Sequence, residues 1–182
     1  MENKSMSFMQ AVQTCFKKSF VFNGRARRSE YWWWTLFVYI VSMVDFVLDG
    51  ALSHSNPFLS LFYHTCTLVF TIYIGIASTA VGMRRLHDIG RSGWWYGAAM
   101  IYAVIWILLV IIKIAYNVSG MNLDAYGDSS ALSLAIVNGI LDVIIIPCVP
   151  YLIYSIVLLV WSCKDSQPGT NKYGENPKGV VE

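Results

Sequence analysis

Four apolar runs, each about as long as a bilayer is thick, constrain this chain more than any other feature of its sequence. They cover 31–50, 59–83, 93–112 and 140–162. A helix needs roughly 20 apolar residues to cross a hydrocarbon core about 30 Å thick. Backbone groups in lipid must pair within their own segment, so the runs are predicted to be helices. The predicted fold is therefore all-α, an integral membrane four-helix bundle in a single domain over 1–182.

The composition agrees with a membrane location. The chain is 56% hydrophobic and 13% charged, whereas soluble domains carry roughly 25% charged residues. Its first thirty residues include Lys17, Arg25 and Arg28 and contain no apolar stretch followed by a small-residue cleavage site, so a secretory signal peptide is not predicted. The first apolar run is therefore expected to remain as a span.

The positions of the 13 Lys and Arg residues predict the orientation. Six precede the first run, three lie in the 84–92 loop, three follow the last run, and Lys113 stands alone. The connections at 50–58 and 117–130 contain none. Because cationic residues collect in cytoplasmic segments, both termini and the 84–92 loop are predicted to be cytoplasmic in a bacterial inner membrane.

A further helix is predicted before the first span, over 6–20. Phe8, Val12 and Phe16 recur at intervals of four residues, and Lys17 marks the other side. This pattern is typical of an amphipathic helix that lies on the membrane surface. The competing interpretation is a frayed terminus.

Two features near the C-terminus depart from a simple span. Pro147 and Pro150 lie inside the fourth run and should kink or loosen its helix, because proline lacks an N–H donor and crowds the preceding turn. The cytoplasmic tail, 163–182, is polar and rich in Pro, Gly and Asn, which predicts irregular turns. Residues 130–139 either begin the fourth helix early or lie along the outer surface.

Three sequence blocks carry a family resemblance: NGRARRSEYWWW, then RRLHDIGRSGWW, then QPGTNKYGENP. In the first two, Arg-Ser comes just before tryptophans, which suits arginines that reach lipid phosphates and indole rings at headgroup depth. From about 8 to 178, the chain resembles the domain-of-unknown-function 805 family. The resemblance implies a small multi-pass bacterial inner-membrane protein whose biochemical activity is not assigned.

The predicted topology gathers a layer of polar side chains at the cytoplasmic face. We favour a network of salt bridges and caps that closes this end of the bundle. A second interpretation is a site for an anionic lipid headgroup or phosphate, whose oxygens a guanidinium can bind in a bidentate manner. A third is a binding motif for a protein partner. The candidate site residues are Arg25, Arg27, Arg28, Arg84, Arg85, His87, Asp88 and Arg91, with Glu30, Asp165 and Glu175 as further acidic members.

Catalysis by this layer is the weakest interpretation. A metal-dependent hydrolase would need more ligands than His87 and Asp88, and His54 and His64 are predicted near the opposite face. A triad with Ser92 would require convergence in space and an oxyanion hole. No catalytic residue, metal or cofactor is predicted.

A second polar set is predicted within the spans, near their outer ends. Ionisable side chains in a span are costly and suggest a functional site. The favoured interpretation pairs Asp45 with His64, and Asp142 with Lys113, to satisfy buried charge; Asp49 lies one turn from Asp45. The alternative is a proton or cation path. The mainly apolar inner halves of the helices argue against such a path.

The sequence therefore favours a non-enzymatic scaffold or accessory protein. Its cytoplasmic Arg/His/Asp layer would contact anionic lipid headgroups or a partner protein. The alternative is a small transporter or channel component using Asp45, His64 and Asp142, and an enzyme acting on a lipid headgroup ranks third. The predicted partners are membrane lipids, with a protein partner or a second copy of the chain as further candidates, and no nucleic acid.

Overall fold

The computed structural model describes residues 6–52, 56–119 and 146–178, with the backbone alone for 114–119 and 146–147. Five helices form the regular structure of these ranges. They are α1 (Phe8–Lys17), α2 (Arg28–Leu52), α3 (Pro57–Asp88), α4 (Trp94–Ser119) and α6 (Ile146–Cys163).

The prediction of an all-α membrane fold is confirmed. By length and composition, α2, α3 and the Trp94–Lys113 part of α4 can each cross a membrane. The described part of the fourth run is a shorter apolar helix, Cys148–Cys163. Its predicted beginning at 140, and the question about 130–139, lie outside the described residues. Pro150 lies inside α6, as expected.

The prediction of a loop over 84–92 is wrong for its first half, because α3 remains helical through Asp88. The charges in this stretch misled the prediction. Arg84, Arg85 and Asp88 are buried, and a continuous helix pairs their backbone groups while their side chains contact protein.

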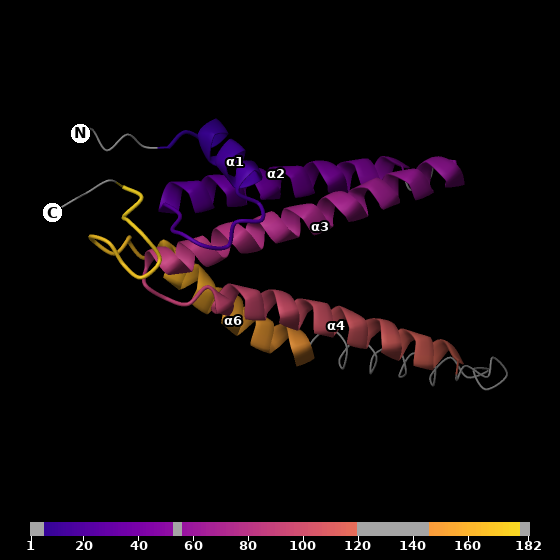
Figure 1. Ribbon diagram of the computed structural model, residues 1–182. Coiled ribbons are helices and arrows are strands. Elements are labelled where there is room, and N and C mark those ends of the chain that lie inside the picture. The colour runs from indigo at the N-terminus through magenta and orange to yellow at the C-terminus, as the bar shows by residue number, and fades with distance from the viewer. Residues whose placement is uncertain (1–5, 53–55, 120–145, 179–182) are drawn as a thin grey trace. The chain divides into compact units, whose positions relative to one another are not determined.

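The described chain forms two compact units. One contains 1–96 and 161–182, and the other contains 97–160. In the first unit, α2 and α3 lie side by side, and α1 lies over the start of α2 (Figure 1). We call this end of the unit its polar end. It comprises the start of α2, the end of α3, the 18–27 connection and the 164–178 tail.

The apolar side of α1 is buried against α2 and α3. The helix begins with a capping box, in which Ser7 and Gln10 each bond the other's backbone N–H. Val12 and Cys15 then enter a core with Trp34 of α2. The predicted amphipathic helix is therefore present, and its buried side covers protein.

A tight turn joins α3 to α4 at the polar end. Gly90 has a φ of 76°, a conformation that glycine adopts without strain. The side-chain amide of Gln167 from the tail fills the space where a Cβ at this position would lie. The hydroxyl of Ser92 accepts the N–H of Trp94 at 3.4 Å. The turn and the tail are thus packed together.

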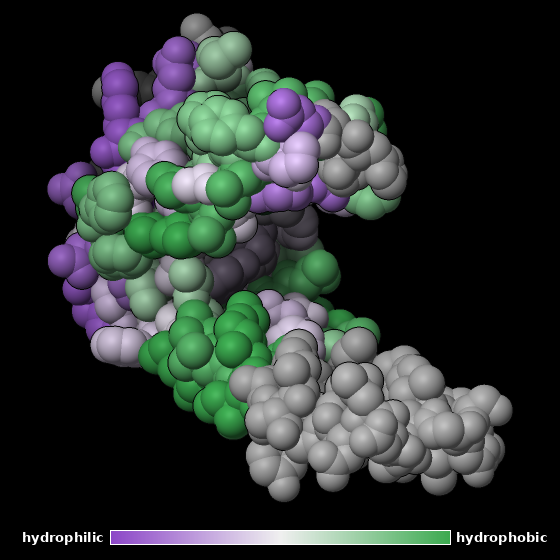
Figure 2. Space-filling view, turned by 90° about the vertical axis from the view of Figure 1, so that its right-hand side faces the viewer, coloured by the Kyte–Doolittle hydropathy of each residue, from purple (hydrophilic) through white to green (hydrophobic). Residues whose placement is uncertain are grey.

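Away from the polar end, the helices expose large hydrophobic side chains. Phe46 and Phe58 are 77% and 79% exposed. Hydrophobic residues cover much of the helix surface visible in Figure 2. In a bilayer these surfaces meet acyl chains, so their exposure suits a membrane protein. In the second unit, α4 and α6 lie side by side, with stacked rings of Tyr102 and Tyr151 between them.

Candidate functional site

Asp88, the last residue of α3, is the centre of a buried ion cluster. Its Oδ1 accepts a hydrogen bond from Arg25 Nε at 2.9 Å, and its Oδ2 accepts from Arg85 Nη1 and from the hydroxyl of Ser166. The side chains of Arg25 and Asp88 are 1% and 0% exposed. A buried carboxylate is costly unless it is paired and hydrogen-bonded. We call Arg25, Arg85 and Asp88 the arginine–aspartate cluster.

Both arginines of this cluster also bind the chain near the C-terminus. Arg25 donates from Nη1 to the carbonyl of Gly169 at 2.8 Å and from Nη2 to that of Gln167 at 2.7 Å. Arg85 Nε donates to the carbonyl of Ser162 at 3.1 Å. A guanidinium has five N–H donors, so it can bind a carboxylate and several carbonyls together. The cluster therefore fixes the tail to the end of α3.

Arg84 holds the connection between α1 and α2. Its Nη1 donates to the carbonyls of Lys18 and Val21, at 2.8 and 2.7 Å, and its Nη2 donates to Glu30 Oε1 at 3.0 Å. The backbone N–H of Ala26 bonds back to the Arg84 carbonyl at 3.0 Å. Arg84 thus links α3 to the first turn of α2 and to the connection that precedes it.

The thiol of Cys15 lies beside the same carboxylate. Its Sγ is 3.9 Å from Glu30 Oε1, within the geometry of a weak hydrogen bond. Burial, and then the negative charge of Glu30, raise the pKa of the Cys15 thiol to about 12. Because the thiolate is the reactive form of cysteine, this residue is protonated and inert at neutral pH.

His87 contacts the tail through its ring. The imidazole stacks on Tyr173 with ring centroids 3.8 Å apart, and its Nδ1 lies 3.1 Å from the carbonyl oxygen of Gly24. A Cβ at Gly93 would lie 2.7 Å from His87 Nε2. His87 and Asp88 therefore bind different groups, although they are adjacent in sequence. Within the described residues, no three His, Cys, Asp or Glu side chains are grouped as metal ligands.

The remaining predicted cations lie around this buried centre. Arg27 Nε donates to the carbonyl of Pro177, and Arg28 is exposed. The guanidinium of Arg91 lies 4.0 Å from the ring centroid of Trp161, which suits a cation–π contact. Trp161 also meets Trp95 edge to face, at 5.5 Å between centroids.

An open cleft lies at the polar end, with a volume of about 470 Å³. Among its lining residues are the cationic Lys18, Arg25 and Arg27 and the acidic Glu30. Arg25 and Glu30 have charged partners elsewhere in the site, at Asp88 and Arg84. The cationic residues that line the cleft outnumber the carboxylates, so the cleft suits an anion.

At the opposite end of α2 and α3 lie two smaller polar contacts, which we call the distal pairs. The hydroxyl of Tyr63 donates to Asp45 Oδ1 at 2.6 Å. His64 Nδ1 lies 3.6 Å from Asp49 Oδ1, and both side chains are about half exposed. The predicted pairing of Asp45 with His64 is therefore wrong. Both carboxylates lie on one face of α2, and the rotation of α3 brings His64 to the second of them.

The other predicted pair is only partly described. Lys113 lies in α4, whereas Asp142 lies outside the described residues. Their pairing, and a path that uses Asp142, remain predictions.

The sequence did not indicate how the tail binds to the rest of the polar end. We expected Asp165 and Glu175 to supply its charge partners, but backbone carbonyls of the tail accept from Arg25 and Arg85 instead. Asp165 pairs with Lys178 within the tail. Three buried arginines have far more donors than two carboxylates can accept, so carbonyl acceptors are needed. The sequence alone did not show that these arginines are buried.

Comparison with known proteins identifies the family to which this chain belongs. The model of the family "Protein of unknown function (DUF805)" matches residues 19–175. The chain is similar to the Inner membrane protein YhaI of Escherichia coli (strain K12), at 33% identity over 114 residues, which are 63% of this chain and 91% of that protein. It is also similar to the Inner membrane protein YhaH of that strain, at 30% identity over 105 residues, or 56% of this chain and 81% of that protein. No solved structure matches significantly.

Proposed function

The chain belongs to the DUF805 family of unknown function, and we propose that it is a non-enzymatic scaffold or accessory protein of a bacterial inner membrane. Its polar end faces the cytoplasm and contacts anionic lipid headgroups. The observation that carries this proposal is the cleft whose lining includes Lys18 and Arg27. The third cation of the lining, Arg25, is buried and bound to Asp88. Two lining residues, Arg25 and Glu30, belong to buried ion pairs with Asp88 and Arg84.

The distribution of cations supports the cytoplasmic orientation. Of the 13 Lys and Arg residues, 12 precede the first run, lie at 84–92 or follow the last run, which leaves Lys113 alone (13 − 1 = 12). Such residues collect on the cytoplasmic side of inner-membrane proteins. The anionic leaflet surface attracts them, by about 1 kcal/mol for each cation near the surface.

A neighbouring tryptophan, Trp33, supports the proposal that the cleft lies at the depth of the lipid headgroups. The indole N–H of Trp33 donates to the carbonyl of Met6 at 3.1 Å, and Met6 lines the cleft. The ring of Trp33 meets Phe8 of α1 edge to face. Tryptophan side chains prefer the interface between the hydrocarbon and the headgroups. A phosphate at this depth is within reach of the cationic lining.

A pair of matched variants tests the proposal. The double variant Lys18→Ala/Arg27→Ala removes two positive charges from the cleft. The control, Lys17→Ala/Arg28→Ala, removes the same charge from adjacent positions outside its lining. Native mass spectrometry then measures the phosphatidylglycerol retained by each purified protein relative to phosphatidylethanolamine.

We expect the first variant to lose phosphatidylglycerol selectively and the control to retain it. Melting temperatures identify a variant that has lost its fold. Equal retention by the two variants would contradict a headgroup site in the cleft. In that case, the cations act only through the general surface potential.

A further inference from the structure

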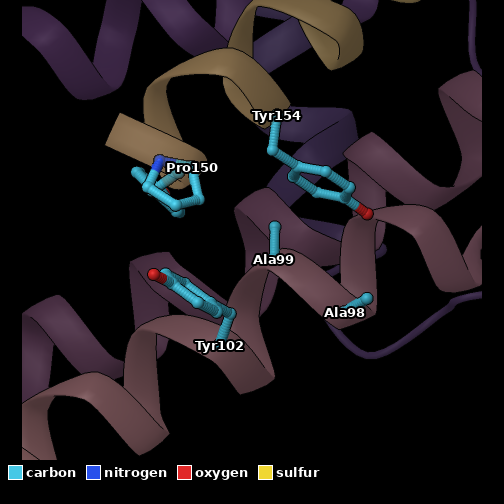
Figure 3. Close-up of a pocket in the computed structure, with 6 residues that line it drawn as sticks. Ala98, Ala99, Tyr102, Pro150 and Tyr154 are labelled. Atoms are coloured by element: carbon cyan, nitrogen blue, oxygen red, sulfur yellow. The ribbon is translucent and has the colours of Figure 1, made fainter. Parts of the chain in front are cut away.

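We propose that a cavity between α4 and α6 binds one hydrocarbon chain of a membrane lipid. The cavity has a volume of about 250 Å³ and lies wholly within the unit that contains 97–160. Its ligand and its residues differ from those of the headgroup cleft. It is lined by Ala98, Ala99 and Tyr102 from α4 and by Pro150, Tyr151 and Tyr154 from α6 (Figure 3).

The cavity follows from small and irregular residues where two helices meet. Ala98 and Ala99 present only methyl groups, which leave space beside larger neighbours such as Tyr102. On the facing helix, Pro150 has no N–H to donate to the carbonyl four residues earlier, and its ring crowds that turn. Side chains therefore do not fill the gap between α4 and α6 at this level.

Aromatic rings form the walls of the cavity. Tyr102 and Tyr151 stack with centroids 5.9 Å apart and an interplanar angle of 10°. Figure 3 shows the rings of Tyr102 from α4 and Tyr154 from α6 on either side of Ala99, with Pro150 on the same helix as Tyr154. Such flat, carbon-rich walls offer dispersion contacts along an extended chain.

The chemistry of the lining selects hydrocarbon over other occupants. No Lys, Arg, Asp or Glu is among the lining residues that the structure describes, so a charged headgroup would lose its hydration without gaining a partner there. An ordered water needs two to four polar partners, and the described side chains of the lining offer tyrosine hydroxyls alone. Tyr102 and Tyr154 already have other interactions. A methylene chain needs no polar partner.

The size and the surroundings suit a single chain. Cavities that enclose drug-sized ligands and cofactors measure about 300 to 1,000 Å³, so this one is too small for most of them. Both helices belong to apolar runs, and a cavity between them in the bilayer is surrounded by lipid chains. A phospholipid acyl chain and an isoprenoid chain share the required chemistry.

Photocrosslinking of the full-length protein in detergent tests the proposal. The probe is phosphatidylglycerol with a diazirine in one acyl chain, and peptide mass spectrometry locates the adducts. We expect adducts at Tyr102 and Tyr151 that saturate with probe concentration. Unlabelled phosphatidylglycerol and a polyprenol are the competitors. Suppression by either one supports the site and identifies the chain that binds better, whereas no suppression by both would overturn it.

Two variants of α4 connect the adducts to the cavity. Ala99→Phe fills the cavity and should abolish the saturable adducts. Val104→Phe also places a phenyl ring on α4, at a position outside the lining where the side chain is 49% exposed, and should preserve them. Equal adducts in both variants would contradict the proposal. If Ala99→Phe does not fold, the competition experiment on the unchanged protein decides.

Discussion

The same two helices carry a carboxylate–cation contact at each end, and the two contacts differ in almost every physical respect. At the polar end, Glu30 of α2 binds Arg84 of α3 at 3.0 Å, with side chains that are 5% and 2% exposed. At the distal end, Asp49 and His64 are 3.6 Å apart and 51% and 50% exposed. A carboxylate meets a basic side chain at both ends. Burial and additional partners therefore decide how much each pair contributes to the stability of the fold.

Additional partners strengthen the polar end. Arg84 also binds two backbone carbonyls, and the arginine–aspartate cluster packs beside it. No carbonyl contact of this kind supports the His64 pair among the described residues. A half-exposed pair gains little, because its attraction is offset by screening and by lost side-chain freedom.

The largest effect is expected from Asp88→Ala. The substitution leaves Arg25 and Arg85 buried without their carboxylate, and such a loss typically costs about 3 to 5 kcal/mol. Unfolding by sodium dodecyl sulfate in mixed micelles measures the free energy. The control is Asp165→Ala, which removes an exposed carboxylate from the tail. A loss below about 1 kcal/mol for Asp88→Ala would mean that solvent reaches the cluster.

Glu30→Gln should have the next largest effect. The amide keeps the shape of the side chain but loses the charge that Arg84 faces, and a hydrogen bond to a charged group contributes about 1.5 to 3 kcal/mol. The substitution also removes the charge that helps to raise the pKa of Cys15. The same micelle titration measures the loss. An unchanged stability would show that the backbone carbonyls alone can satisfy the buried Arg84 guanidinium.

Tyr63→Phe is expected to cost less, because the hydroxyl that it removes has one O–H, shared between Oδ1 and the backbone carbonyl of Asp45. Hydrogen bonds between membrane helices contribute about 0.6 kcal/mol on average and at most about 1.7. Asp45 loses its donor but is only partly buried. In the micelle titration, this variant should have a higher free energy of unfolding than Glu30→Gln. The reverse order would contradict the claim that the polar end contributes more stability than the distal pairs.

Asp49→Asn should change stability by only about 0.2 kcal/mol, the lower end of the range for exposed ion pairs. His64→Asn is the matched variant on α3. A loss above about 1 kcal/mol for either substitution would indicate that protein covers this end.

The smallest effect concerns the exposed pair in the tail. The hydrogen bond from Lys178 lowers the pKa of Asp165. A carboxyl group with a lowered folded-state pKa stabilises the fold above its unfolded pKa, and this contribution disappears as the pH falls through the folded value. Asp165→Asn should therefore reduce tail docking slightly at pH 7 and not at all at the acidic limit. Hydrogen exchange of the tail amides at both pH values measures this difference.

The sequence predicted most of the fold because membrane spans depend on local composition. The apolar runs at 31–50 and 93–112 match α2 and α4 closely, and the amphipathic pattern before them matches α1. The members of the arginine–aspartate cluster were also identified as neighbours. The predicted topology places all three at one membrane face, since each lies close to the end of a predicted apolar run.

The specific pairings could not be predicted, because they depend on how the helices rotate against one another. Asp45 and Asp49 share a face of α2, and only the packing of α3 decides which of them meets His64. Arg84 and Arg85 lie in a helix because protein buries them at the end of α3. Their charges predicted an exposed loop instead. The acceptors in the tail are backbone carbonyls, which every residue has, so no sequence letter marks them.

The most direct test compares Glu30→Gln with Asp49→Asn in one mixed-micelle titration of the full-length protein. Each variant neutralises one carboxylate of α2 while keeping its shape, so burial and partner number are the main differences. We expect Glu30→Gln to lose more free energy of unfolding than Asp49→Asn, by more than about 1 kcal/mol. Equal losses, or a larger loss for Asp49→Asn, would contradict the claim that the polar end holds α2 and α3 together.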